Sequence, residues 1–160
     1  MKTLAIYPGS FNPLHIGHKN IIDKTINIFG KENVVLAIGI NPEKIDLDGR
    51  DEFYAKSRTE ANRLSEKLGI RATVYTTFLH QLVESHENDY NVVIIRGLRN
   101  GEDLDYEVNQ IRFMDELKTG KKLNFCFLMC DKEFEHISST SIRQLESFSK
   151  GSSAKYIFFT

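Results

Sequence analysis

The sequence predicts a doubly wound α/β fold, in which a parallel sheet of five strands carries helices on both faces. Short apolar runs rich in β-branched and aromatic residues alternate with helical patterns along the whole chain, and several of those helical patterns stop at a glycine. A chain of 160 residues suits one domain, which buries roughly two-thirds of its unfolded surface and needs no disulfides. We expect a single domain over residues 1–160.

Five apolar runs are predicted as strands. Each is short and rich in the residue types of strands that are buried on both faces of a parallel sheet. They cover residues 3–7, 34–40, 72–75, 92–95 and 123–129. Cys126 lies in the last run and Cys130 directly follows it, so four residues of extended chain separate their Cα atoms by about 13 Å, too far for a disulfide. Both cysteines are therefore predicted to pack in the core.

Five segments with apolar residues at helical spacing are predicted as helices. They cover residues 16–29, 53–68, 78–86, 103–117 and 139–148. Gly30, Gly69 and Gly120 follow three of them, at the position where glycine commonly ends a helix. The polar stretch 41–52 is the one long loop of the predicted fold.

Charge and hydropathy exclude several classes of protein. The formal net charge is −1, which argues against a general binder of nucleic acid or of anionic membranes. The apolar run near the N-terminus is too short for a signal peptide, and no run approaches membrane-spanning length. A cytoplasmic protein is expected.

The most informative stretch is YPGSFNPLHIGH, residues 7–18, which reads as a strand end, a tight turn and a helix start. A helix that begins there leaves backbone N–H groups and a positive dipole end facing whatever lies above the strand. Gly9 and Gly17 let a ligand approach the backbone. His15 and His18 add donors that can be cationic near neutral pH. These features predict an enzyme that handles phosphate.

The tetrad HIGH, residues 15–18, matches the (H/T)xGH signature of the nucleotidylyltransferase superfamily. IRGLR at 95–99, DLDYE at 103–107 and ISST at 137–140 resemble, in order and spacing, the phosphopantetheine adenylyltransferase family, and the blocks span nearly the whole chain. The resemblance implies a nucleotidylyltransferase, Rossmann-like sheet with strand order 3-2-1-4-5. Residues 9–18 and 96–103 should then face each other over one crevice, at the point where the winding reverses.

The resemblance also implies a reaction and its partners. The reaction is adenylyl transfer from ATP to 4′-phosphopantetheine, which gives dephospho-coenzyme A and pyrophosphate in coenzyme A biosynthesis. Mg²⁺ is the implied cofactor and would bridge the departing phosphates. No residue of the chain is predicted as a metal ligand. The family is usually hexameric, so a homo-oligomer is expected, and the aromatic residues near the C-terminus should pack on the body of the protein or on a neighbour.

The resemblance assigns roles to individual residues. His18 is the implied catalytic residue, which binds ATP and stabilises the transition state. The residues implied on the acceptor side are Ser10, Lys44, Leu79 and Arg96. The residues implied on the ATP side are Ser10, Phe11, His18, Gly97, Leu98, Arg99, Glu107, Ser138, Ser139 and Thr140.

Most of these positions also admit a structural role. His15, where the family commonly has threonine, could cap the turn, and residues 138–140 could cap the final helix. Arg96 and Arg99 could form a surface cluster with the acidic residues at 102–105.

Two rival functions stay open. GSFNP at 9–13 and ISSTSIR at 137–143 also resemble nicotinamide mononucleotide adenylyltransferase, although RGLR at 96–99 argues against that enzyme. The other rival is a nucleotide-binding regulatory module that has kept the fold and lost catalysis.

Overall fold

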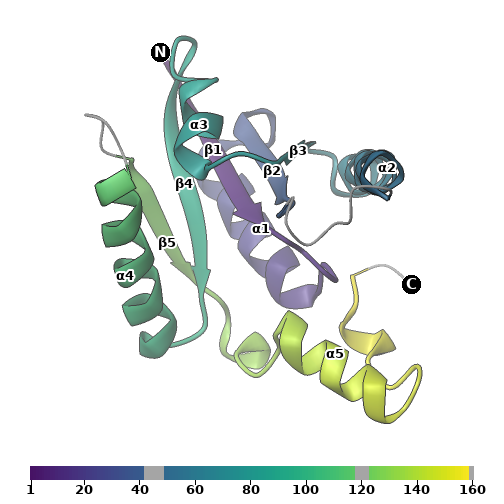
Figure 1. Ribbon diagram of the computed structural model, residues 1–160. Helices are drawn as coiled ribbons and strands as arrows, with labels where there is room; N and C mark the ends of the chain where they lie inside the picture. The colour runs from purple at the N-terminus through teal and green to yellow at the C-terminus, as the bar shows by residue number, and fades with distance from the viewer. Residues whose placement is uncertain (42–48, 118–122, 159–160) are drawn as a thin grey trace.

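The computed structural model describes residues 1–41, 49–117 and 123–158, and in them one sheet of five parallel strands in the order β3-β2-β1-β4-β5 (Figure 1). The strands are β1 (Lys2–Gly9), β2 (Val34–Gly39), β3 (Arg71–Tyr75), β4 (Tyr90–Leu98) and β5 (Phe125–Met129). Fold class and strand order are as predicted. The winding reverses between β1 and β4, so the carboxyl ends of these two strands flank the expected ligand position.

The helices lie close to the predicted segments. They are α1 (Ile16–Phe29), α2 (Arg50–Leu68), α3 (Leu79–Glu84), α4 (Gly101–Leu117) and α5 (Ser139–Phe148). The bounds of α1 and α5 agree with the prediction, whereas α3 is shorter and α2 and α4 begin earlier. Gly120, the predicted end of α4, lies outside the described residues. Within the described part of the chain, no helix combines the length and apolarity needed to cross a membrane.

β4 continues past residue 95, where the predicted strand ends, because its backbone stays paired with β5. Arg96, Gly97 and Leu98 pair in register with residues 127–129 of β5. The extended pairing holds the backbone of these three residues, so the loop that follows them begins from a paired strand. We call residues 96–103 the arginine turn and residues 9–18 the histidine turn.

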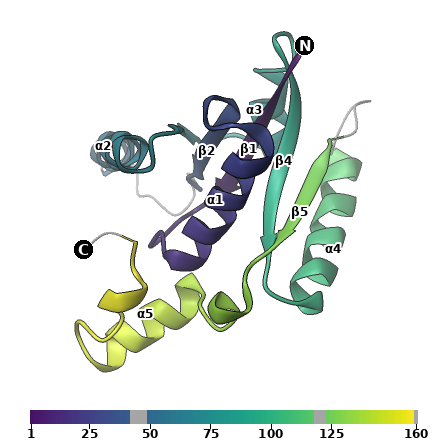
Figure 2. The same cartoon turned by 180° about the vertical axis from the view of Figure 1, so that it is seen from behind.

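The core consists of two clusters, one on each face of the sheet. Successive residues of a strand point to opposite faces, so Ala5 and Tyr7 belong to the cluster under α1 and α2, while Leu4 and Ile6 belong to the cluster under α3. Figures 1 and 2 view these opposite faces, with α3 in front of the sheet in one and α1 in the other.

The two cysteines pack against the core, as predicted. Cys126 and Cys130 are free thiols, each half-buried against the cluster under α1 and α2.

The C-terminal segment returns to the histidine turn. Ile157 forms an antiparallel bridge with His15, and the Phe158 backbone N–H donates a 3.2 Å hydrogen bond to the Leu14 carbonyl. The Phe158 ring packs against the first core cluster, with the Lys19 ammonium 5.5 Å from its centroid. The prediction that the C-terminal aromatics pack is thus confirmed for the described residues, and they pack on the body of the protein itself.

Candidate active site

A cavity of about 320 Å³ opens at the carboxyl edge of the sheet, between the ends of β1 and β4. Three segments line it: the histidine turn, the arginine turn, and the stretch that leads into α5. Figures 1 and 2 show α5 lying beyond that edge of the sheet. The prediction that the two turns face one crevice is therefore confirmed. Its lining residues are Tyr7, Pro8, Gly9, Ser10, Phe11, His15, Gly17, His18, Ile21, Arg96, Gly97, Leu98, Arg99, Cys130, Phe134, Ile137, Ser138 and Ser139.

The two histidines cap helix α1 reciprocally. His15 Nδ1 accepts hydrogen bonds from the backbone N–H groups of Gly17 at 3.1 Å and His18 at 3.3 Å, and His18 Nδ1 accepts from the His15 N–H at 3.1 Å. The two rings stack with their centroids 3.7 Å apart. A Cβ at Gly17 would lie 2.9 Å from the His15 ring, so a larger residue there would displace the cap. The capping role considered for His15 is confirmed.

This geometry sets the protonation of both rings. Burial lowers the pKa of His15 to about 4, with a further contribution from Arg99, and it lowers the pKa of His18 to about 3, with a further contribution from His15. The expectation of cationic histidines is therefore wrong, because both rings are neutral near pH 7. Because each Nδ1 is an acceptor, each neutral ring carries its proton on Nε2. His18 thus lines the cavity as a neutral ring that carries one N–H donor.

Acidification is expected to destabilise the protein through these histidines. Their folded pKa values lie below the ordinary 6.5, so the unfolded chain binds more protons and stability is lost as the pH falls below 6.5. At pH 5 each ring lowers the free energy of unfolding by about 2 kcal/mol relative to pH 7.

Urea unfolding at pH 7 and at pH 5 measures this difference in the free energy of unfolding. His15→Thr, which keeps a capping hydroxyl, should remove about half of it, and His136→Gln, at an exposed histidine, should leave it unchanged. A difference that survives in His15→Thr would contradict the assignment.

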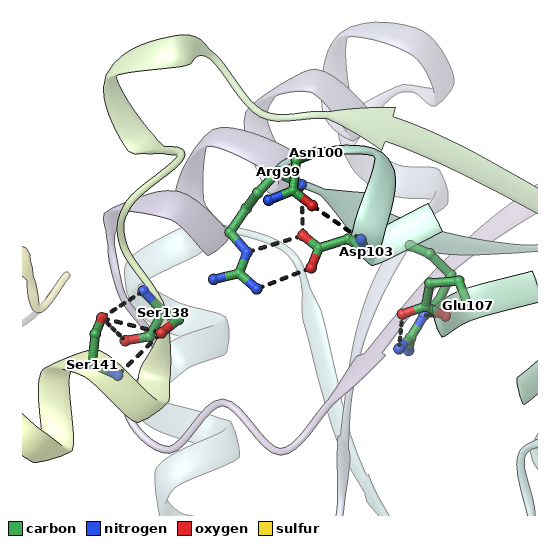
Figure 3. A network of polar contacts seen from close by, with 7 residues as sticks. Arg99, Asn100, Asp103, Glu107, Ser138 and Ser141 are labelled. Atoms are coloured by element: carbon green, nitrogen blue, oxygen red, sulfur yellow. Dashed lines mark hydrogen bonds and ion pairs between the residues drawn. The ribbon is translucent and has the colours of Figure 1, made fainter. Parts of the chain in front are cut away.

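The Arg96 side chain is held by Glu107 of α4, which Figure 3 labels. Arg96 Nε and Nη2 donate to the two Glu107 carboxylate oxygens at 2.9 and 2.7 Å, and Nη1 donates to the Pro8 carbonyl at 3.3 Å. The exposed fractions of the side chains are 28% and 11%. Burial acts to lower the pKa of Arg96, but the hydrogen bonds to Glu107, together with the charge interactions with Glu107, Tyr7 and Tyr75, raise that pKa above its ordinary value. The guanidinium is thus a fixed, permanently charged group at the cavity wall.

Arg99 is held in the same way by Asp103. Asp103 accepts from the Arg99 side chain through both carboxylate oxygens, at 2.9 Å each (Figure 3). The sequence left two interpretations of the arginine turn, a surface cluster of charges and a phosphate site, and the structure has features of both. Each arginine forms an ion pair with an acidic residue of α4, and the two acidic residues lie one helical turn apart. Each arginine also lines the cavity.

The start of α5 is tied to the histidine turn. The Ser138 hydroxyl accepts from the Ser141 N–H at 3.0 Å and caps the helix, while the Ser139 hydroxyl donates to the Pro13 carbonyl at 3.2 Å. Arg143 donates to the Asn12 carbonyl at 2.6 Å. The N-termini of α1 and α5 therefore meet at one cavity, and backbone N–H groups at such ends favour anionic ligands.

Most of the predicted site residues that the structure describes come together at the cavity, and three of the described ones do not. Glu107 is buried behind Arg96 and does not line the cavity. Thr140 is exposed on the first turn of α5. Leu79 packs against the core cluster under α3, on the other face of the sheet. Lys44 lies outside the described residues.

Sequence reasoning missed one polar group of the cavity. Tyr7 is 6% exposed, its ring packs edge-on against Phe11 with centroids 5.1 Å apart, and burial raises the pKa of its hydroxyl. A Cβ at Gly97 would lie 2.8 Å from Ile21 and 3.4 Å from the Tyr7 hydroxyl, so the glycine makes room for both side chains. The available signal was the position of Tyr7 at the end of an apolar strand, just before the turn.

Comparisons with known proteins agree with this picture. The family described as cytidylyltransferase-like matches residues 6–145. Curated proteins named phosphopantetheine adenylyltransferase are 32% identical in Sinorhizobium fredii (95% of this chain, 90% of that protein), 32% in Mycoplasma capricolum (92% and 99%) and 33% in Leptospira biflexa (91% and 84%). A solved nicotinic acid mononucleotide adenylyltransferase of Plasmodium falciparum, complexed with NaAD, has a TM-score of 0.59 at 16% identity, covering 99% of this chain and 91% of that one. The structural likeness shows a shared fold.

Proposed function

The chain belongs to the phosphopantetheine adenylyltransferase family of cytidylyltransferase-like proteins, and from that premise we propose how its cavity transfers the adenylyl group of ATP to 4′-phosphopantetheine. The products are dephospho-coenzyme A and pyrophosphate, so the enzyme is a nucleotidyltransferase of coenzyme A biosynthesis. The observation that carries the proposal is the single cavity that the histidine turn and the arginine turn share.

The chemistry requires no nucleophile from the protein. An oxygen of the acceptor phosphate attacks the α-phosphorus of ATP in line, and a P–O bond forms. The bond from the α-phosphorus to the oxygen bridging the β-phosphorus breaks, and pyrophosphate leaves with that electron pair. The attacking phosphate is already an anion at neutral pH, so the protein acts by holding the reactants in line and by stabilising charge at the α-phosphorus.

The cavity supplies donors of the kinds that this reaction needs. We assign the neutral Nε2–H of His18 to the α-phosphate, where charge shifts during transfer. Arg99 and the N-terminal ends of α1 and α5 would hold the triphosphate, and Arg96 with Ser10 would hold the acceptor phosphate. The remaining roles stay predictions from the family resemblance: Lys44 and Leu79 on the acceptor, and Phe11, Gly97, Leu98, Glu107 and Thr140 on ATP.

Mg²⁺ fits this site as an ion carried by the nucleotide. Among the described residues, no three His, Cys, Asp or Glu side chains are grouped to hold a metal, and the cavity lining contains no carboxylate. Mg²⁺ commonly binds through substrate phosphates and water. The residues assigned to the triphosphate would therefore hold it indirectly, and the ion would supply charge neutralisation on the departing pyrophosphate.

Two further predictions concern the state of the protein. Exposed aromatic side chains on α4, Tyr106 at 62% and Phe113 at 60%, support self-association, which light scattering measures as molar mass. The cytoplasmic location stays a prediction from the sequence.

A coupled pyrophosphate assay tests the proposed function. We expect pyrophosphate release with ATP, Mg²⁺ and 4′-phosphopantetheine together, and background release when any one of them is left out, including when EDTA removes Mg²⁺. Turnover of nicotinamide mononucleotide without turnover of phosphopantetheine would overturn the choice of acceptor. ATP binding by calorimetry, with no release for any acceptor, would instead indicate a catalytically silent nucleotide-binding module.

A further inference from the structure

Asp103 does not line the cavity, yet it makes three hydrogen bonds to one residue that does. Its Oδ2 accepts from the Arg99 backbone N–H at 2.8 Å and from Nε at 2.9 Å, and its Oδ1 accepts from Nη2 at 2.9 Å (Figure 3). The Asp103 N–H in turn donates to the Asn100 side chain at 3.0 Å, which fixes the carboxylate at the start of α4. The contact is more extensive than an ordinary surface ion pair.

The two hydrogen bonds from the Arg99 side chain to Asp103, which we call the Asp103 fork, leave the other edge of the guanidinium available. Arg99 has five side-chain N–H groups, and Asp103 takes one on Nε and one on Nη2. In the part of the chain that the structure describes, no acceptor bonds the two on Nη1 or the second on Nη2. The guanidinium is planar, so holding one edge also sets the direction of the other. Arg99 lines the cavity, where a phosphate oxygen would meet such donors.

The charges of the pair agree with this arrangement. The hydrogen bonds that Arg99 donates to Asp103 lower the pKa of the Asp103 carboxyl and raise the pKa of the Arg99 guanidinium, so both groups stay ionised at neutral pH. The Arg99 side chain is 40% exposed and would otherwise sample many rotamers. Ordering it before the ligand arrives removes an entropic cost from binding.

We infer that Asp103 is a positioning residue for the nucleotide, which holds Arg99 with its open edge ready for the phosphate oxygens of ATP. The inference deepens the proposed function, on which it rests for the identity of the nucleotide. The alternative is a purely structural role, in which Asp103 only caps the N-terminus of α4 through the Arg99 and Asn100 contacts.

Calorimetric titration with ATP separates these roles. Asp103→Asn keeps a side-chain oxygen for the Arg99 backbone N–H and loses the charged fork, and we expect the Kd for ATP to rise about 10-fold. Asp105→Asn makes the same change of charge at an exposed position of α4 and should leave the Kd unchanged. In an Arg99→Ala background, Asp103→Asn should add no further loss, because its target is absent. Arg99→Lys keeps the positive charge but cannot form the fork. It therefore tests whether the fork sets the Kd for ATP, and it leaves unchanged the backbone N–H that Asp103 accepts from at the start of α4.

Several outcomes would overturn the inference. One is an unchanged or tighter Kd in Asp103→Asn with a normal Kd in Arg99→Lys. Another is an equal loss from Asp103→Asn in the presence and absence of Arg99. Wild-type protein that fails to bind ATP would overturn both this inference and the proposed function. Wild-type protein that binds ATP but releases no pyrophosphate with phosphopantetheine would overturn the proposed function alone, because the Kd comparison does not involve the acceptor.

Discussion

Replacement of His18 by alanine is expected to lower kcat about 100-fold or more, while the KM for ATP changes less than about threefold. The physical reason is the neutral Nε2–H of the cavity-lining His18, which we assign to the α-phosphate and whose hydrogen bond gains strength as charge shifts there. Steady-state kinetics with ATP and 4′-phosphopantetheine measure the two constants separately.

A matched variant separates the donor from the helix cap. His18→Asn places an amide oxygen where Nδ1 accepts from the His15 N–H, so it should keep the cap and still lose the donor. We expect it to be as slow as His18→Ala but nearer to wild type in melting temperature. Equal losses of ATP affinity in both variants, with unchanged kcat, would show that His18 binds the ground state only.

Replacement of Arg96 by alanine is expected to destabilise the protein by about 3–5 kcal/mol and to abolish measurable transfer to phosphopantetheine. Removal of the guanidinium leaves the Glu107 carboxylate, whose side chain is 11% exposed, without its two hydrogen bonds. Chemical unfolding measures the first effect and the pyrophosphate assay measures the second.

A double variant shows that the two effects have different causes. Arg96→Met combined with Glu107→Leu replaces the buried pair by apolar side chains of similar size, which is often neutral for stability. We expect unfolding close to wild type and no recovery of activity. Recovered activity in the folded double variant would remove Arg96 from the proposed acceptor site.

The sequence predicted best those elements whose ends are set locally. α1 and α5 have the predicted bounds because their caps, His15 and Ser138, directly precede the first helical turn. β4 was predicted too short because Arg96 and Gly97 are poor strand residues by composition. Their strand conformation comes from pairing with β5, which is distant in sequence.

Within the site, the sequence identified the residues better than their physical states. The position of His18 follows from a motif, but its neutral state follows from burial and from the stacked His15 ring, which only the folded chain brings about. The acidic cluster near Arg96 and Arg99 was visible, but which carboxylate holds which arginine depends on the angle of α4 to β4. The buried hydroxyl of Tyr7 gave no signal beyond its place in the strand.

The bridge between His15 and Ile157 joins positions near opposite ends of this sequence. Closing a contact between such distant residues has an entropic cost, whereas β1 keeps its pairing with β2 and β4 without it. Local opening of the yellow segment of Figure 1 would therefore remove a neighbour of the histidine turn while the sheet stays paired. The candidate site would then lose order at a lower free energy than the sheet on which it is built.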